Sequence, residues 1–170
     1  MISSYVIKVR TGMIINSKQQ LKKIIKELKE SGQNTIAVVP GTYRYPHVGH
    51  IFILKKAYEK VAPKNGVVFA LVNSTDSIAS IKPKTDFIFE DENRKALIDL
   101  LPYVHYTVMF DQDTPEELCK IIQPTFLIKG DDWKDKKLPE AKYCKNVVFV
   151  KRIKRTNAKK MVELIRGKTK

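Results

Sequence analysis

Short apolar runs alternate along this chain with amphipathic stretches of helical spacing. The runs are rich in β-branched and aromatic residues: TIAVV (35–39), VVFALV (67–72), VHYTVMF (104–110), TFLIK (125–129) and NVVFV (146–150). Strands that are apolar almost throughout are typical of a parallel sheet buried on both faces. The pattern therefore predicts an α/β fold: a doubly wound, Rossmann-like parallel sheet with helices on both faces, in a single domain.

The amphipathic stretches between these runs predict the helices. Ser17 can cap the first helix, with Gln20 three positions later, and Ser31 and Gly32 supply its end. Further helices are expected from His47 or Val48 to just before Pro63, over ENRKALIDLL (92–101), over DTPEELCKII (113–122), and from about Asn157 onward.

The stretch DTPEELCKII carries its own start signal. Thr114 matches a capping residue, Pro115 a first-turn proline, and Glu117 the acid of a capping box. The periodicity of the first twelve residues, which include YVIKV (5–9), fits either an edge strand or an arm. A chain of 170 residues is long enough for one core, so we expect residues 1–170 to form one domain.

The charge balance favours polyanionic partners. Lys and Arg number 32 against 18 acidic residues, a formal charge of +14, which suits phosphorylated metabolites, nucleic acid or an acidic membrane face. Cys119 and Cys144 have neither a paired zinc spacing nor the density of a disulfide scaffold, which indicates a reducing compartment. No apolar stretch approaches the roughly 18 residues of a membrane span. We therefore expect a cytoplasmic protein without a membrane partner.

The chemistry that the sequence suggests is concentrated in GTYRYPHVGH (41–50), directly after the first long apolar run. Gly41 allows a tight turn, and His47 and His50 lie one helical turn apart, where both can face an anion at a helix N-terminus. A metal would need a third ligand. His105 falls in a predicted strand and the cysteines are isolated, so no metal site is expected.

The motif Gly41-Thr42-Tyr43 followed by His47-x-Gly49-His50 resembles the signature of the cytidylyltransferase-like nucleotidyltransferases. The likeness extends over roughly residues 11 to 166. VNSTDSIASIK (72–82) and ENR (92–94) resemble later parts of that family, and FDQDTPEEL with IQPTFLIKGDDW resembles the heptose-1-phosphate adenylyltransferase branch. GDDW (130–133) is also similar to glycerol-3-phosphate cytidylyltransferases.

This resemblance implies a role for each matching residue. It puts His47 and His50 at the α-phosphate, Lys82 on the incoming substrate or the phosphates, and Arg94 on the phosphate chain, as the catalytic group. The substrate side is expected to include Arg44 and Asn73. The nucleotide-binding residues that it implies are Gly41, Thr42, Tyr43, Gly49, Gly130, Asp131, Asp132, Trp133, Arg152 and Asn157.

The sequence also departs from the family pattern. The family usually has Asp or Asn where Arg44 stands, Arg-Pro at 86–87, Asp where His105 stands, and Ser-Thr-Thr at 157–159. The last change removes hydroxyls that would bind phosphate, although backbone amides and Lys159 could still serve. Substrate identity and full activity are therefore the points that the resemblance leaves open.

The reaction that the resemblance implies is in-line attack by a phosphate monoester on the α-phosphorus of a nucleoside triphosphate, with release of pyrophosphate. A monoester has a second pKa of about 6, so no general base is required. Mg²⁺ is expected to be carried mainly by the triphosphate. ATP with a sugar 1-phosphate is favoured over CTP with a polyol phosphate, and family relatives are commonly homodimers.

Two other interpretations remain open from the sequence. A class I aminoacyl-tRNA synthetase fragment would share the His-x-Gly-His turn, but AKKM (158–161) is a poor match to the lysine-rich loop of such enzymes. A catalytically degenerate relative could instead bind nucleotide, or grip nucleic acid through its basic surface. Arg44 and the changed residues 157–159 motivate that alternative.

Overall fold

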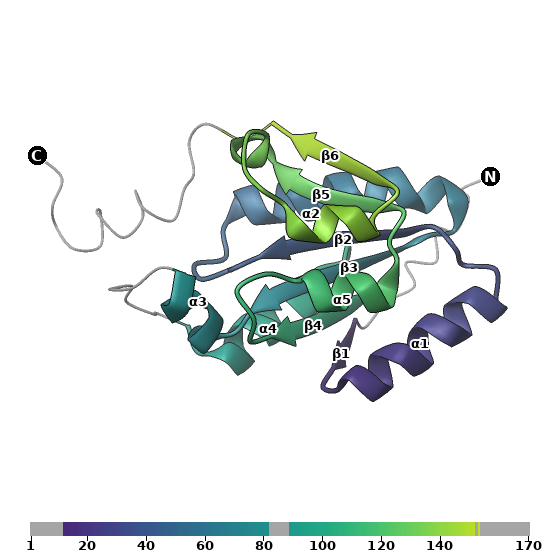
Figure 1. Ribbon diagram of the computed structural model, residues 1–170, viewed down its shortest axis with the longest axis horizontal. Helices are drawn as coiled ribbons and strands as arrows, with labels where there is room; N and C mark the ends of the chain where they lie inside the picture. The colour runs from purple at the N-terminus through teal and green to yellow at the C-terminus, as the bar shows by residue number, and fades with distance from the viewer. Residues whose placement is uncertain (1–11, 82–88, 152, 154–170) are drawn as a thin grey trace, which may run out of the picture.

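A computed structural model describes residues 12–81, 89–151 and 153. These residues form a six-stranded sheet in which every pairing is parallel (Figure 1). The strands are β1 (Met13–Ile15), β2 (Ile36–Gly41), β3 (Val67–Asn73), β4 (Tyr106–Phe110), β5 (Phe126–Gly130) and β6 (Asn146–Val150). The helices are α1 (Lys18–Glu30), α2 (Val48–Val61), α3 (Thr75–Ile81), α4 (Asp91–Asp99) and α5 (Glu116–Ile122), with short 3₁₀ turns η1 (Ala62–Lys64), η2 (Asp131–Trp133) and η3 (Pro139–Tyr143).

The strand order is β1-β4-β3-β2-β5-β6. From β2 the chain builds outward through β3 and β4, and it then returns to the other side of β2 to add β5 and β6. The order therefore reverses between β2 and β5, and in open parallel sheets such a reversal leaves a crevice at the carboxyl ends of the strands. The predicted α/β, doubly wound, Rossmann-like sheet is confirmed.

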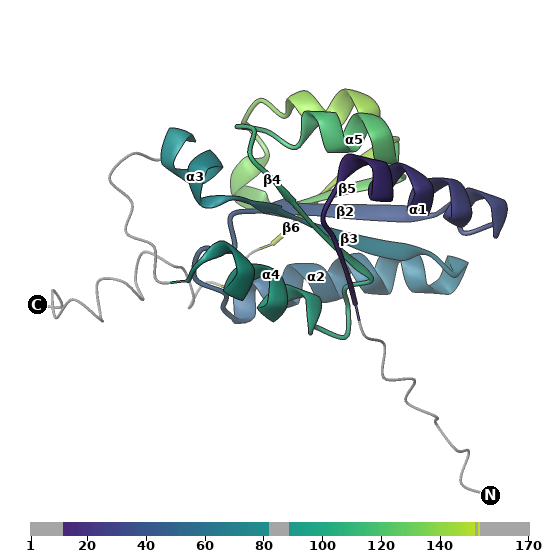
Figure 2. The ribbon, with the colours of Figure 1, turned by 90° about the horizontal axis from the view of Figure 1, so that it is seen from below.

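Helices cover both faces of the sheet (Figure 2). The strands alternate their side chains between two cores: Phe69 of β3 packs with α1 and α5, whereas Val68 and Ala70 pack with α2 and α4. Because both faces of the sheet are covered by apolar cores, the sequences of these strands are continuous apolar runs. The same alternation sends Leu127 of β5 toward α1 and α5, and Ile128 toward α2.

The start of α1 is confirmed, but the predicted start of α5 is wrong. Ser17 caps α1 by accepting from the backbone N–H of Gln20 at 3.1 Å. At α5 the N-cap residue is Pro115 and no side chain caps the helix, so Thr114 does not have that role. The acid expected to complete the capping box, Glu117, instead forms an ion pair with Lys18 of α1.

Two elements were absent from the sequence-based prediction. Strand β1 is only three residues long and adds to the sheet edge beside β4. Helix α3 lies between the predicted strand 67–72 and the predicted helix 92–101, and Asp91 accepts hydrogen bonds from the N–H and hydroxyl of Thr75 at its start. The predicted arm or edge strand before residue 12 and the closing helix from Asn157 lie outside the described residues.

Candidate active site

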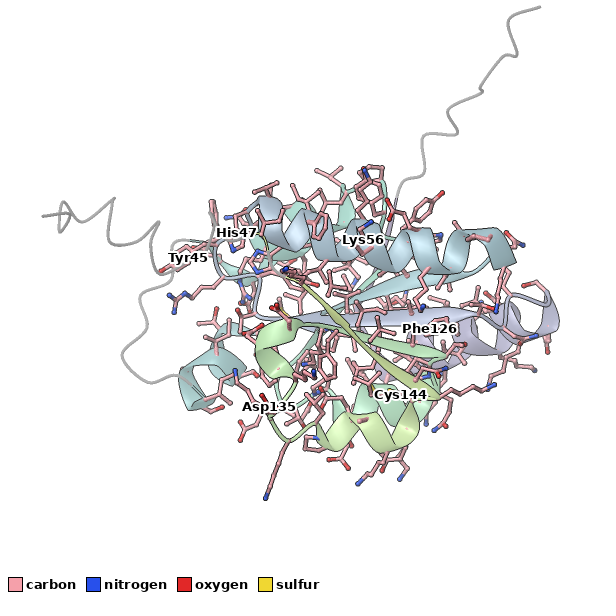
Figure 3. The ribbon with its side chains drawn as sticks, turned by 90° about the horizontal axis from the view of Figure 1, so that it is seen from above. Tyr45, His47, Lys56, Phe126, Asp135 and Cys144 are labelled. Atoms are coloured by element: carbon pink, nitrogen blue, oxygen red, sulfur yellow. The ribbon has the colours of Figure 1, made fainter. Side chains whose placement is uncertain are left out.

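A cleft of about 730 Å³ opens at the carboxyl ends of β2 and β5, where the strand order reverses. Its walls come from the turn after β2, the first turn of α2, the end of β3, the loop before α5, and the segment from β5 through η3. Figure 3 shows His47 at the N-terminal end of α2, with Tyr45 beside it. The fold thus brings the His-x-Gly-His turn and the GDDW segment, far apart in sequence, into one cavity.

The turn after β2 is fixed by Tyr43, which adopts a left-handed backbone conformation with φ of 44°. Its ring is buried, and its hydroxyl donates a hydrogen bond to the carbonyl of Val39 at 2.8 Å. A Cβ on Gly41 would stand only 3.1 Å from this ring, so the position favours glycine. The same ring lies 5.1 Å from the ring of His50, centroid to centroid, and packs beside it.

The two histidines form a reciprocal cap at the start of α2. The Nδ1 atom of His47 accepts from the backbone N–H of Gly49 at 3.0 Å, and the Nδ1 atom of His50 accepts from the backbone N–H of His47 at 3.3 Å. An Nδ1 atom that accepts carries no proton, so each neutral ring has its hydrogen on Nε2. Both rings are therefore oriented as Nε2–H donors, with centroids 4.0 Å apart.

Burial keeps both imidazoles neutral. It lowers the pKa of His50 to about 3, with a smaller contribution from the neighbouring His47, and it also lowers the pKa of His47. At neutral pH each ring therefore offers one hydrogen-bond donor without a charge. Such a pair can donate hydrogen bonds to phosphoryl oxygens without transferring a proton.

Arg94 lies behind the cleft wall and does not line the cavity. Its side chain is fully buried, and its guanidinium donates to the carbonyls of Thr42 and Asn73, both at 2.6 Å. It also pairs with Asp91. Burial alone would raise the pKa of Asp91, but hydrogen bonds from Thr75 and Arg94 together lower it. In this arrangement Arg94 ties the ends of β2 and β3 to the starts of α3 and α4.

Residues 38–166 match the family model described as cytidylyltransferase-like. The chain belongs to the cytidylyltransferase-like family. This confirms the resemblance seen in the His-x-Gly-His and GDDW motifs, and it identifies the domain as a nucleotidyltransferase.

Individual proteins are also similar to this chain over most of its length. The bifunctional protein HldE of Helicobacter hepaticus is 33% identical over 151 residues, which cover 89% of this chain and 30% of that protein. The bifunctional protein HldE of Nitratiruptor sp. is 31% identical over 160 residues, which cover 94% of this chain and 34% of that protein. The chain thus spans about a third of the length of these relatives.

Solved structures share the fold. The lipopolysaccharide core biosynthesis protein of Thermoplasma volcanium superposes with a TM-score of 0.56 at 21% identity, covering 70% of this chain and 98% of that one. The macrolide-efflux protein of Streptococcus pneumoniae superposes with a TM-score of 0.64 at 15% identity, covering 91% of this chain and 57% of that one.

The structure places most of the expected cytidylyltransferase-like site residues in the cleft. His47 and His50 line it together with the expected residues Gly41, Thr42, Tyr43, Gly49, Asn73, Gly130, Asp131, Asp132 and Trp133. Arg44, expected on the substrate side, does not line the cleft, because its guanidinium stacks on the ring of Tyr45, 4.4 Å from the centroid. Lys82, Arg152 and Asn157 lie outside the described residues.

Sequence reasoning missed a buried ion pair in the cleft wall. Lys129, at the end of β5, contacts Glu140 of η3 with Nζ to Oε1 at 3.1 Å. Both residues line the cleft, as do Lys137 and Lys151. A signal was available, because a lysine inside an otherwise apolar strand is seldom buried without a partner. Its partner, eleven residues further along, could not be identified from spacing.

Two further observations concern metals and membranes. Within the described ranges, no group of three or more His, Cys, Asp and Glu side chains is arranged to hold a metal ion. In the same part of the chain, no helix combines the length and the apolar character needed to cross a bilayer.

Proposed function

We propose that this domain transfers a nucleoside monophosphate from a nucleoside triphosphate to a sugar or polyol phosphate and releases pyrophosphate. ATP is the favoured donor and CTP the alternative. An oxygen of the acceptor phosphate attacks the α-phosphorus, and the bond from that phosphorus to the bridging oxygen of the β-phosphate breaks. The leaving group is pyrophosphate, and the product contains a diphosphate linkage.

The observation that carries this proposal is the pair of neutral imidazoles at the N-terminus of α2. Both direct Nε2–H donors from a rigid cap, with the amide dipoles of the helix behind them. Donors fixed before the reaction stabilise charge on phosphoryl oxygens as it redistributes. The acceptor phosphate is already an anion near neutral pH, so the site needs positioned donors more than a base.

Mg²⁺ is part of the proposal as an ion that arrives with the triphosphate. It would offset charge on the pyrophosphate leaving group. The carboxylates of Asp131 and Asp132 line the cleft and are of the hard oxygen type that Mg²⁺ or its water shell accepts. Lys82 remains a predicted contact of the incoming substrate or the phosphates, and Arg152 and Asn157 remain predicted contacts of the nucleotide. A homodimer remains a prediction from the family resemblance.

The test is pyrophosphate release, measured with each of the four nucleoside triphosphates against a panel of sugar 1-phosphates and polyol phosphates. We expect turnover with ATP, or with CTP, that depends on the acceptor and on Mg²⁺. His50→Ala should reduce it by on the order of 10²–10³. Near-normal turnover after this substitution, or turnover without any acceptor, would contradict the proposal.

The degenerate binding module remains the second candidate, and the same panel separates it. This candidate would be favoured if no pair of substrates released pyrophosphate and the protein bound RNA or DNA tightly in a salt-dependent way. One observation argues against it. Tyr45 is only 3% exposed and lies under the guanidinium of Arg44, so its ring does not offer the open stacking platform that single-strand binders use.

A further inference from the structure

The buried pair Lys129–Glu140 lies in the cleft wall but has no role in the proposed phosphate chemistry. The side chains of Lys129 and Glu140 are 7% and 2% exposed, respectively. Lys129 also lies 4.2 Å from the centroid of the Trp133 ring, which closes over it. Burying both charges is costly unless their remaining hydrogen-bonding capacity is satisfied. A pair retained in a cavity wall therefore calls for a ligand.

The unsatisfied capacity has a definite chemical form. A lysine ammonium has three N–H donors, and among the described residues Glu140 accepts one of them while the Trp133 ring covers another direction. Glu140 accepts from the lysine through Oε1, and its Oε2 is the second acceptor of the carboxylate. The wall thus places a charged donor beside a charged acceptor.

Charge decides which ligand fits. Glu140 would repel a phosphate placed against Lys129, and Lys129 would repel a cation placed against Glu140. A hydroxyl both donates and accepts, so neighbouring hydroxyls can accept from the ammonium and donate to the carboxylate. From this geometry we infer that Lys129 and Glu140 form a subsite that binds a vicinal diol of a substrate.

The inference rests on the proposed function for the source of the diol, and two sources share this chemistry. One is the ribose of the nucleoside triphosphate, and the other is the polyhydroxyl part of the acceptor. Charged hydrogen bonds to a ligand hydroxyl contribute enough that its removal weakens binding by roughly 10-fold to 100-fold. A purely structural pair would not sense that hydroxyl.

The experiment measures affinity by calorimetry and needs no turnover. The first arm compares ATP and CTP with their 2′-deoxy and 3′-deoxy forms. The second arm, run with a non-hydrolysable nucleotide present, compares mannose 1-phosphate and glucose 1-phosphate with their monodeoxy analogues. Each arm uses the wild type and the double variant K129M/E140Q, which removes both charges at similar volume, because removing one partner alone would leave the other charge buried and unpaired.

The control is the ion pair Lys142–Glu116, which also involves η3 but joins it to α5, outside the cleft, with Nζ to Oε1 at 2.6 Å. In one arm we expect the wild type to lose about 10-fold to 100-fold in affinity for the deoxy probe. K129M/E140Q should bind both probes of that arm with equal, reduced affinity, and K142M/E116Q should behave as the wild type.

Two results overturn the subsite. One is that K129M/E140Q keeps the wild-type preference for the diol in both arms, and the other is that the wild type shows no preference in either arm. Failure of the proposed function looks different: the diol preference depends on the pair, but no pyrophosphate is released with any acceptor. Circular dichroism and thermal melting of both double variants establish that each is folded.

Discussion

The rings of His47 and His50 lie 4.0 Å apart, centroid to centroid, and each holds its Nδ1 against a backbone N–H of the turn they share. The histidines therefore build the start of α2 as well as facing the cleft. A substitution at either position affects the helix cap and the donor together, and the two effects must be separated by the choice of variant.

His50→Ala should reduce kcat by on the order of 10²–10³, because it removes a donor held in place before the reaction. The measurement is pyrophosphate release under saturating nucleotide, with unfolding followed in parallel. His47→Asn is the informative companion, since asparagine is a good N-cap residue but lacks the Nε2–H donor. We expect His47→Asn to keep its melting temperature and lose turnover. Full activity in both variants would show that neither imidazole contributes to catalysis.

Stability should depend on pH through the buried imidazoles. The pKa of His50 is about 3 in the folded chain, against roughly 6.5 for an unperturbed histidine. Between these values the unfolded state binds more protons, so the stabilisation is fully present above about pH 6.5 and is lost as pH falls toward 3. His47, whose pKa is also lowered, adds in the same direction. Urea unfolding at a series of pH values measures the effect.

The slope of the unfolding free energy should reach about 1.4 kcal/mol per pH unit for one proton. His50→Gln should flatten the dependence over this range. Parallel curves for the wild type and His50→Gln would mean that His50 does not titrate differently in the two states. Turnover, by contrast, should fall only below about pH 6, where the acceptor monoester gains a proton.

Gly41→Ala should destabilise the protein by about 1–3 kcal/mol, the usual cost of inserting a group into a packed site. The new Cβ would meet the Tyr43 ring at 3.1 Å and push it against His50. Turnover should fall as well, because the donor moves. Gly32→Ala is the control: its φ of 78° strains an alanine, but nothing lies within 4 Å of the added atom. That variant should lose stability and keep its kcat; equal kinetic losses in both would refute a local effect at the turn.

Arg94→Met should lower the free energy of unfolding by about 3–5 kcal/mol. The substitution leaves Asp91 and two backbone carbonyls behind the cleft wall without the guanidinium donor. Denaturant titration measures this loss. Glu92→Gln on the same helix removes an ion pair with Lys95 whose acid is 79% exposed, and it should cost less than about 1 kcal/mol.

A direct role of Arg94 on the phosphate chain would give a different result. Nucleotide affinity would then fall even in conditions where the variant is fully folded, and Arg94→Lys would restore much of it. If the side chain acts only through the backbone carbonyls, Arg94→Lys should be almost as unstable as Arg94→Met, since a lysine lacks the planar fork that reaches three acceptors.

Strong local signals correctly predicted the first helix and the alternation of buried strands with helices. Ser17 before an amphipathic stretch and Gly32 after it bounded α1, because capping is decided by neighbours a few residues apart. The capping signal at Thr114 was equally clear in the sequence, but the predicted capping box did not form. Lys18, which is distant in sequence, instead forms an ion pair with Glu117. Helix α3 was missed for a related reason: its start is held by Asp91, sixteen residues later.

What the sequence by itself determined was the alternation of buried strands with helices and the placement of two histidines at a helix start, since apolar periodicity and capping are local properties. Only the tertiary structure decided that Arg94 turns inward and that Lys129 meets Glu140 beneath Trp133. These contacts join residues from different strands and turns. Their geometry depends on the strand order, which no local pattern specifies.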